Sequence, residues 1–122
     1  MFDDTDSYLK NSPVLQAANV HTPLLSWTGA EDRHVNYYQS IEFYLALRRL
    51  GKKHTMLIYP GDGHALMDGS NQKDLTQRTE EWFGYYLKNE TLKSWMVADS
   101  YERFRPKSEK HNTIDSLDVI IF

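Results

Sequence analysis

The chain of 122 residues contains no cysteine, which excludes disulfide bonds, thiolate catalysis and cysteine-rich zinc modules together. It also contains no apolar run close to the roughly 18 residues that a membrane-spanning helix needs, so we expect no membrane partner. An excess of positive charge is missing as well, because 14 Lys and Arg face 17 Asp and Glu. Nucleic acid held by phosphate neutralisation is therefore not an expected partner.

The composition describes a globular protein of modest size. Apolar residues make up 40% and charged residues 25% of the chain, which indicates one folded core rather than wholesale disorder. The acidic start of the sequence lacks the basic and then apolar pattern of a secretory signal. Cytoplasmic and periplasmic or secreted locations both stay open, since a secreted protein need not contain cysteine.

Apolar patterning predicts two strands that alternate with two helices. Pro23–Gly29 and His54–Tyr59 are short apolar runs bounded by proline and glycine, as is typical of buried strands. Helices are expected over residues 36–50 and 72–88. This order predicts an α/β fold with a parallel strand pair and helices on the faces of the sheet. Two parallel strands are too few for independent stability, so the segment is expected to belong to a larger sheet.

The side chains expected on the buried helix faces follow helical spacing, and Asn36 is expected to cap the first helix. The predicted faces consist of Tyr37, Ile41, Tyr44 and Leu45 in the first helix and of Leu75, Trp82, Phe83, Tyr86 and Leu87 in the second. The last apolar run, Val119–Phe122, is expected to add an edge strand, to pack on a partner or to fray.

An acid and an imidazole follow the two predicted strands. Asp32 lies in the loop after the first strand. His64 lies in the loop after the second strand, directly after Pro60-Gly61-Asp62-Gly63. Functional groups of open α/β sheets gather at the carboxyl ends of strands. If the two strands are neighbours, Asp32 can reach Nδ1–H of His64, as the acid of a Ser–His–Asp triad does.

The residues around Asp32 and His64, and the other histidines and cations, allow further interpretations. Glu31 competes with Asp32 as the acid, His34 could line a substrate cleft, and Asp62 is interpreted as a turn residue. The five histidines do not show the i, i+4 spacing of a helical zinc motif, so we expect no metal site. The cations at 48–53 match the negative end of a helix dipole better than a phosphate site.

An ordered set of short motifs resembles the prolyl oligopeptidase family. The matching stretches are Ser12-Pro13, Thr22-Pro23-Leu24-Leu25, Gly29-x-x-Asp32-x-x-Val35, Gln39-Ser40, Phe43-Tyr44-x-Ala46-Leu47-x-x-Leu50-Gly51 and Tyr59-Pro60-Gly61-x-Gly63-His64. The resemblance implies a C-terminal fragment of an α/β-hydrolase domain over residues 1–90. Residues 91–122 would then form an extension that is partly ordered or packed on a partner.

The same resemblance implies the chemistry of a serine peptidase that cleaves short peptides without a metal or organic cofactor. It places the triad acid at Asp32 and the triad base at His64. The family's nucleophile motif, Gly-x-Ser-x-Gly, does not occur in the sequence, so we expect the chain to be inactive by itself. The alternative is a non-catalytic binding or assembly module derived from an α/β-hydrolase. Because truncation of the sheet exposes a strand edge and apolar faces, self-association through the first strand's edge, the helix faces or the C-terminus is expected.

Overall fold

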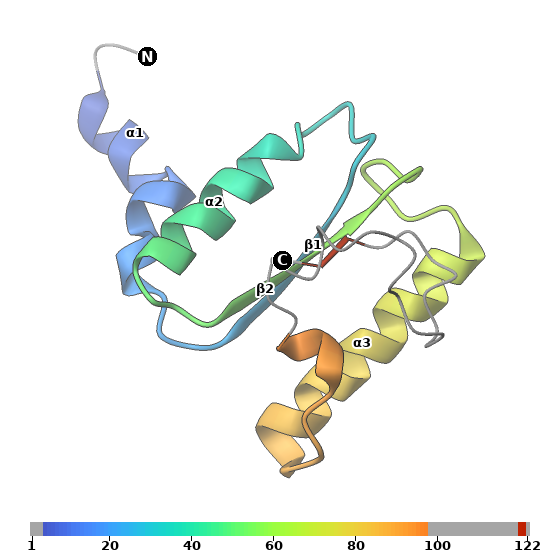
Figure 1. The fold of residues 1–122 in the computed structure, drawn as a ribbon. Helices are drawn as coiled ribbons and strands as arrows, with labels where there is room; N and C mark the ends of the chain where they lie inside the picture. The colour runs from blue at the N-terminus through green and yellow to red at the C-terminus, as the bar shows by residue number, and fades with distance from the viewer. Residues whose placement is uncertain (1–3, 98–119, 122) are drawn as a thin grey trace, which may run out of the picture.

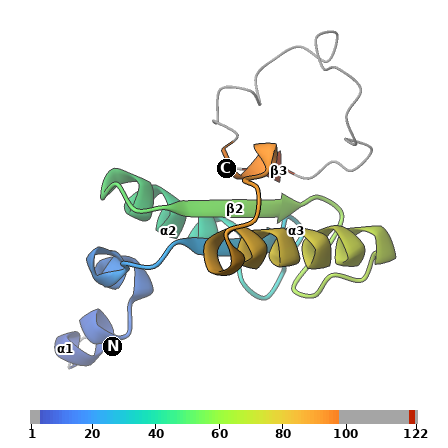
Figure 2. The same cartoon turned by 90° about the horizontal axis from the view of Figure 1, so that it is seen from below.

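The computed structural model describes residues 4–97 and 120–121, and it places two long helices on opposite faces of a small sheet (Figures 1 and 2). The expected α/β class is confirmed. In order, the elements are α1 (Thr5–Lys10), the 3₁₀ helix η1 (Pro13–Asn19), β1 (Leu24–Gly29), α2 (Tyr38–Arg49), β2 (His54–Tyr59), α3 (Gly69–Lys88), the 3₁₀ helix η2 (Ser94–Met96) and β3 (Ile120–Ile121). Among the described residues, no helix is both long and apolar enough to cross a membrane.

The sheet has the strand order β1-β2-β3, with β1 and β2 parallel. Their register runs from Leu24 beside His54 to Gly29 beside Tyr59, so the two strands begin and end together. Ile120 and Ile121 pair antiparallel with β2. Of the three expectations for the last apolar run, this pairing matches an added edge strand. Val119 and Phe122 lie outside the described residues.

The core is built around β2, whose side chains alternate between the two helices. Met56 and Ile58 pack with Tyr44 of α2, and all three side chains are buried. Tyr59 points to the other face, where its hydroxyl donates to Oδ2 of Asp74 in α3 at 2.8 Å. The central strand is therefore covered on both faces, as its continuous apolar sequence predicts.

The first long helix differs from its predicted form at the ends and in one buried position. It covers Tyr38–Arg49 rather than residues 36–50, and its N-cap is Tyr37 rather than the expected Asn36, although Oδ1 of Asn36 accepts from the Tyr38 N–H at 3.0 Å. Leu45 was expected on the buried face, but it is 56% exposed, whereas Leu47 is fully buried. The prediction for Leu45 was wrong because the buried face of α2 includes Tyr44 and Leu47, and Leu45 lies beside that face.

The second long helix begins three residues earlier than predicted, at Gly69 rather than Gln72. The side chain of Asp68 accepts from the N–H groups of Ser70 and Asn71, which makes it the N-cap. Trp82 of the predicted face is buried, but the predictions for Phe83 and Leu87 were wrong, because these side chains are 52% and 75% exposed. The apolar stripe of α3 is therefore wider than the surface that the described residues cover.

Residues just beyond position 90 contact α3. The indole Nε1 of Trp95 donates to Oε2 of Glu81 at 2.6 Å, and the guanidinium of Arg78 lies 5.2 Å from the centre of a Trp95 ring. Arg78 also bonds Asp74, the partner of Tyr59, so these contacts join η2 to the sheet through α3. The expected division into residues 1–90 and 91–122 stays a prediction.

Gly29, the last residue of β1, lies close against the loop that follows β2. A Cβ atom at this position would overlap the carbonyl oxygens of Asp62 and Gly63, which belong to the loop after β2. Because both are backbone atoms, the overlap could be relieved only by moving that loop. The residue type at position 29 thus decides whether the two loops can lie against each other.

We expect Gly29→Ala to lower the free energy of unfolding by about 1–3 kcal/mol, the usual cost of forcing an extra carbon into a packed site. Chemical denaturation of the two proteins measures this difference. Gly63→Ala is the matched control, since a Cβ there meets no atom closer than 3.5 Å. Equal stability of Gly29→Ala and the wild-type chain would contradict the close approach.

Candidate active site

Two loops at the same edge of the sheet carry the candidate functional side chains. Residues 30–37 follow β1, and residues 60–68 follow β2. The pairing of the strands continues into the loops, because the N–H of Ala30 donates to the Tyr59 carbonyl and that of Glu31 donates to the Asp62 carbonyl, both at 3.0 Å. The loops are therefore neighbours for the reason expected from the sequence: the strands before them are adjacent and parallel.

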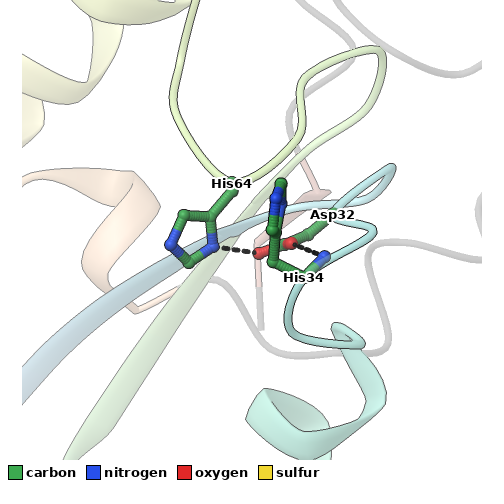
Figure 3. Close-up of side chains that lie close together, drawn as sticks. All are labelled: Asp32, His34 and His64. Carbon is green, nitrogen blue, oxygen red and sulfur yellow. Dashed lines mark hydrogen bonds and ion pairs between the residues drawn. The ribbon is translucent and has the colours of Figure 1, made fainter.

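Asp32 and His64 meet across these loops. Nδ1 of His64 lies 2.9 Å from Oδ2 of Asp32, with the imidazole donating its Nδ1–H to the carboxylate (Figure 3). The structure thus brings together the two residues singled out in the sequence. Of the two candidate acids, Asp32 makes this contact, and Glu31 contributes its backbone N–H to the loop contact instead.

Local hydrogen bonds hold the Asp32 carboxylate in place. Its Oδ1 accepts from the backbone N–H groups of His34 at 2.8 Å and Val35 at 2.9 Å, which leaves Oδ2 for His64. The pKa of Asp32 is lowered from 3.8 to about 2, and the hydrogen bond from the Val35 N–H is the largest cause. The hydrogen bonds from His64 and His34 also lower this pKa, whereas burial raises it. Asp32 is therefore an anion at neutral pH, with its second oxygen directed at the imidazole.

His64 is accessible, whereas its partner is not. The side chain of His64 is 60% exposed and that of Asp32 is 8% exposed. Within residues 4–97 and 120–121, no serine hydroxyl lies within hydrogen-bond distance of the His64 ring. The pair can accept a proton from a group that approaches Nε2 from outside the described part of the chain.

Asp62 organises the loop that carries His64, a role beyond that of the turn residue it was interpreted to be. It is only 4% exposed. Its Oδ1 accepts from the N–H groups of Met67 at 2.9 Å and Asp68 at 3.3 Å, and its Oδ2 accepts from Nδ2 of Asn71 at 2.7 Å. The bond from Asn71 is the largest cause that lowers the pKa of Asp62. The sequence shows only an acid between two glycines, and nothing in it indicates burial.

His34 also lies at the site. The centres of the His34 and His64 rings are 5.3 Å apart with the planes tilted by 50°. One donor atom each from Asp32, His34 and His64 can be chosen so that all three lie within 4.8 Å of one another. These three residues are the ones in the described part of the chain that could hold a metal ion together.

Comparison with known proteins identifies the family. The model of the prolyl oligopeptidase family matches residues 2–90. The chain belongs to the prolyl oligopeptidase family. The expected resemblance is therefore confirmed, and the acid and the imidazole both lie inside the matched region.

Two curated relatives are named as a peptidase and as an acylamino-acid-releasing enzyme. The chain is 31% identical over 90 residues to the uncharacterized peptidase YuxL of Bacillus subtilis, covering 71% of this chain and 14% of YuxL. It is 33% identical over 82 residues to the acylamino-acid-releasing enzyme of Mus musculus, covering 67% of this chain and 11% of that enzyme. The chain therefore spans about one seventh or less of the length of these relatives.

Solved structures show the same fold. The AtxE2 isopeptidase with Astexin3-dC4 bound matches with a TM-score of 0.62 and 25% identity, over 79% of this chain and 14% of that one. A protein described as a dienelactone hydrolase from Klebsiella pneumoniae matches with a TM-score of 0.56 and 27% identity, over 61% of this chain and 34% of that one. Over the matched residues, this chain therefore has the α/β fold of part of each of these two structures.

We expect the carboxyl ¹³C resonance of Asp32 to titrate with a midpoint of about 2 rather than near 3.8. Because the folded pKa is depressed, the contribution of Asp32 to stability is complete above the unfolded value and is lost as the pH falls through about 2. Asp32→Asn should therefore be less stable than the wild-type chain at neutral pH, with the difference closing in acid. A midpoint near 3.8 would show that the Val35, His64 and His34 bonds are not formed in solution.

Proposed function

We propose that this chain supplies the acid and the base of a Ser–Asp–His triad in a serine peptidase, and that the nucleophilic serine lies on a segment outside this sequence. The observation that carries the proposal is the 2.9 Å contact between Nδ1 of His64 and Oδ2 of Asp32. Membership of a peptidase family supports the reaction class. The absence of Gly-x-Ser-x-Gly from the sequence supports the location of the nucleophile elsewhere.

The proposed mechanism divides the proton transfers between the two residues. His64 Nε2 takes the proton from the serine hydroxyl as its oxygen attacks the peptide carbonyl, and then gives that proton to the leaving amine. Asp32 remains ionised throughout, holds the ring with Nε2 toward the serine and stabilises the imidazolium while it exists. The depressed pKa of Asp32 supports this role, because a carboxyl that stays ionised does not compete for the proton.

The proposed substrate is a short peptide. Two relatives support this: the acylamino-acid-releasing enzyme of Mus musculus and the lasso peptide isopeptidase AtxE2 of Asticcacaulis excentricus, the latter 26% identical over 103 residues. Both names describe action on bonds within peptides or at their acylated ends. The residues that would select the peptide sequence belong, in this proposal, to the remainder of the enzyme.

The remainder of the sheet is proposed to join along β1. Among the described strands, β1 pairs only with β2, and Trp27 of β1 is 39% exposed although it lies in the middle of the strand. In contrast, β2 is buried from Thr55 to Tyr59. An unpaired strand edge with an exposed tryptophan is a surface on which a further strand and its covering elements would pack.

The first test is the activity of the chain alone. We expect no turnover of an acylaminoacyl or dipeptidyl chromogenic substrate and no labelling by a fluorophosphonate, because the base lacks a nucleophile. Activity that disappears in His64→Ala would show that a serine within this chain completes the site.

The second test of the same proposal restores the missing part. Residues 1–90 replace the aligned segment of YuxL, and turnover is measured on the folded, purified chimera. We expect an active chimera whose kcat falls about 10⁴-fold or more in His64→Gln, with His21→Gln as the control at an exposed histidine outside the pair. A folded but inactive chimera, or one unaffected by His64→Gln, would favour the non-catalytic module.

Self-association of the isolated chain is a separate expectation of the open edge. The free side of β1 and the exposed Phe83 and Leu87 of α3 offer apolar surface to a second copy. We expect sedimentation velocity to show assembly that increases with concentration, through β1 pairing or helix contacts. A monomer that persists at high concentration would contradict this expectation.

A further inference from the structure

We propose that Asp32, His34 and His64 form a binding site for a divalent transition-metal ion of the zinc type. The three side chains come from the two loops at the carboxyl ends of β1 and β2, and both imidazoles lie beside the Asp32 carboxylate (Figure 3). The site was not expected from the sequence, because the residues at 32, 34 and 64 have none of the helical spacing that marks common zinc motifs.

The donor atoms are already close to the separation that zinc requires. One donor atom of each residue lies within 4.8 Å of the other two. Bonds of about 2.0–2.2 Å in a tetrahedral site place neighbouring donors about 3.3–3.6 Å apart. We expect rotation of the side chains to close the remaining difference, because both histidines are exposed, with His64 at 60%.

The donor types match zinc rather than the lighter divalent ions. Two imidazole nitrogens and one carboxylate oxygen form a three-residue ligand set with one position left for water. Calcium and magnesium prefer oxygen ligands alone. Nickel and copper accept the same donors as zinc, so the chemistry selects the class of ion and not a single element.

The Asp32 carboxylate is already oriented without a bound ion. Oδ1 of Asp32 is held by the N–H groups of His34 and Val35, and this leaves Oδ2 directed outward, toward His64. In metal sites such outer hydrogen bonds orient the ligating carboxylate and strengthen binding. The bond from the His34 N–H also fixes the backbone from which the His34 ring extends.

Metal binding and the Asp32–His64 hydrogen bond use the same atoms. The ion would take the place of the proton that His64 shares with Oδ2 of Asp32. If the proposed function holds, a bound ion therefore prevents His64 from acting as a base, and the site would be inhibitory. The binding itself depends only on the three side chains in this chain.

The test is isothermal titration calorimetry of the untagged chain with zinc chloride, together with ¹H–¹⁵N spectra of the histidine rings. We expect one saturable ion per chain, with shifts in the His34 and His64 rings and none in His21. Calcium and magnesium chloride should give no binding. We expect His34→Gln to weaken zinc binding about tenfold or more, and His21→Gln, at another exposed histidine, to leave it unchanged.

His34→Gln is informative because His34 is exposed and its backbone N–H, which bonds Asp32, is retained in the variant. Circular dichroism checks that the variant is folded. Wild-type affinity in His34→Gln, or zinc shifts at histidines other than His34 and His64, would overturn the proposal. Calorimetry reads binding without peptidase activity, so an inactive chimera and a failure to bind zinc are separate results.

Discussion

The parallel pairing of β1 with β2, in a register that ends both strands at the same level, positions every candidate functional group of this chain. Gly29 and Tyr59 lie side by side at the end of that pairing, and the loops after them continue the contact through the N–H groups of Ala30 and Glu31. The approach is possible because position 29 has no side chain. A shift of one strand past the other would move the acid and the imidazole out of reach.

The two partners of the central contact are held in different ways, and this difference suits their proposed roles. Asp32 is nearly enclosed and tied to its own loop by two backbone N–H groups, so its charge and direction are constant. His64 is mostly exposed, and the buried Asp62 supports the loop around it. A fixed acid and an accessible base are what proton transfer to an outside group requires.

Much of this arrangement could be predicted from the sequence, because it depends on local patterns. Apolar runs bounded by proline and glycine indicated both strands, and their order along the chain indicated that Asp32 and His64 follow neighbouring strand ends. The start of α3 at Gly69 is set by the Asp68 side chain, which accepts from the N–H groups of Ser70 and Asn71, and an acid at this position is a local signal in the sequence. With that cap included, the sequence supports the helix from Gly69.

Other features depend on contacts between distant residues and have no local pattern. The buried Asp62 accepts from Asn71 and from two backbone amides five and six residues along the chain, and Leu45 is exposed although Tyr44 and Leu47 on the same helix are buried. The convergence of His34 with the Asp32–His64 pair likewise arises only when the loops are placed in space. The sequence therefore predicted the contact between Asp32 and His64, but not the position of His34 or the burial of Asp62 beside it.

The central claim is that His64 donates Nδ1–H to Asp32 and keeps Nε2 free to accept a proton. The most direct measurement is the ¹⁵N chemical shifts of the two His64 ring nitrogens at a pH where the ring is neutral. We predict a protonated Nδ1 and an unprotonated Nε2, with this preference lost in Asp32→Asn. A wild-type ring that carries its proton on Nε2, or that averages between both nitrogens as a free imidazole does, would contradict the account.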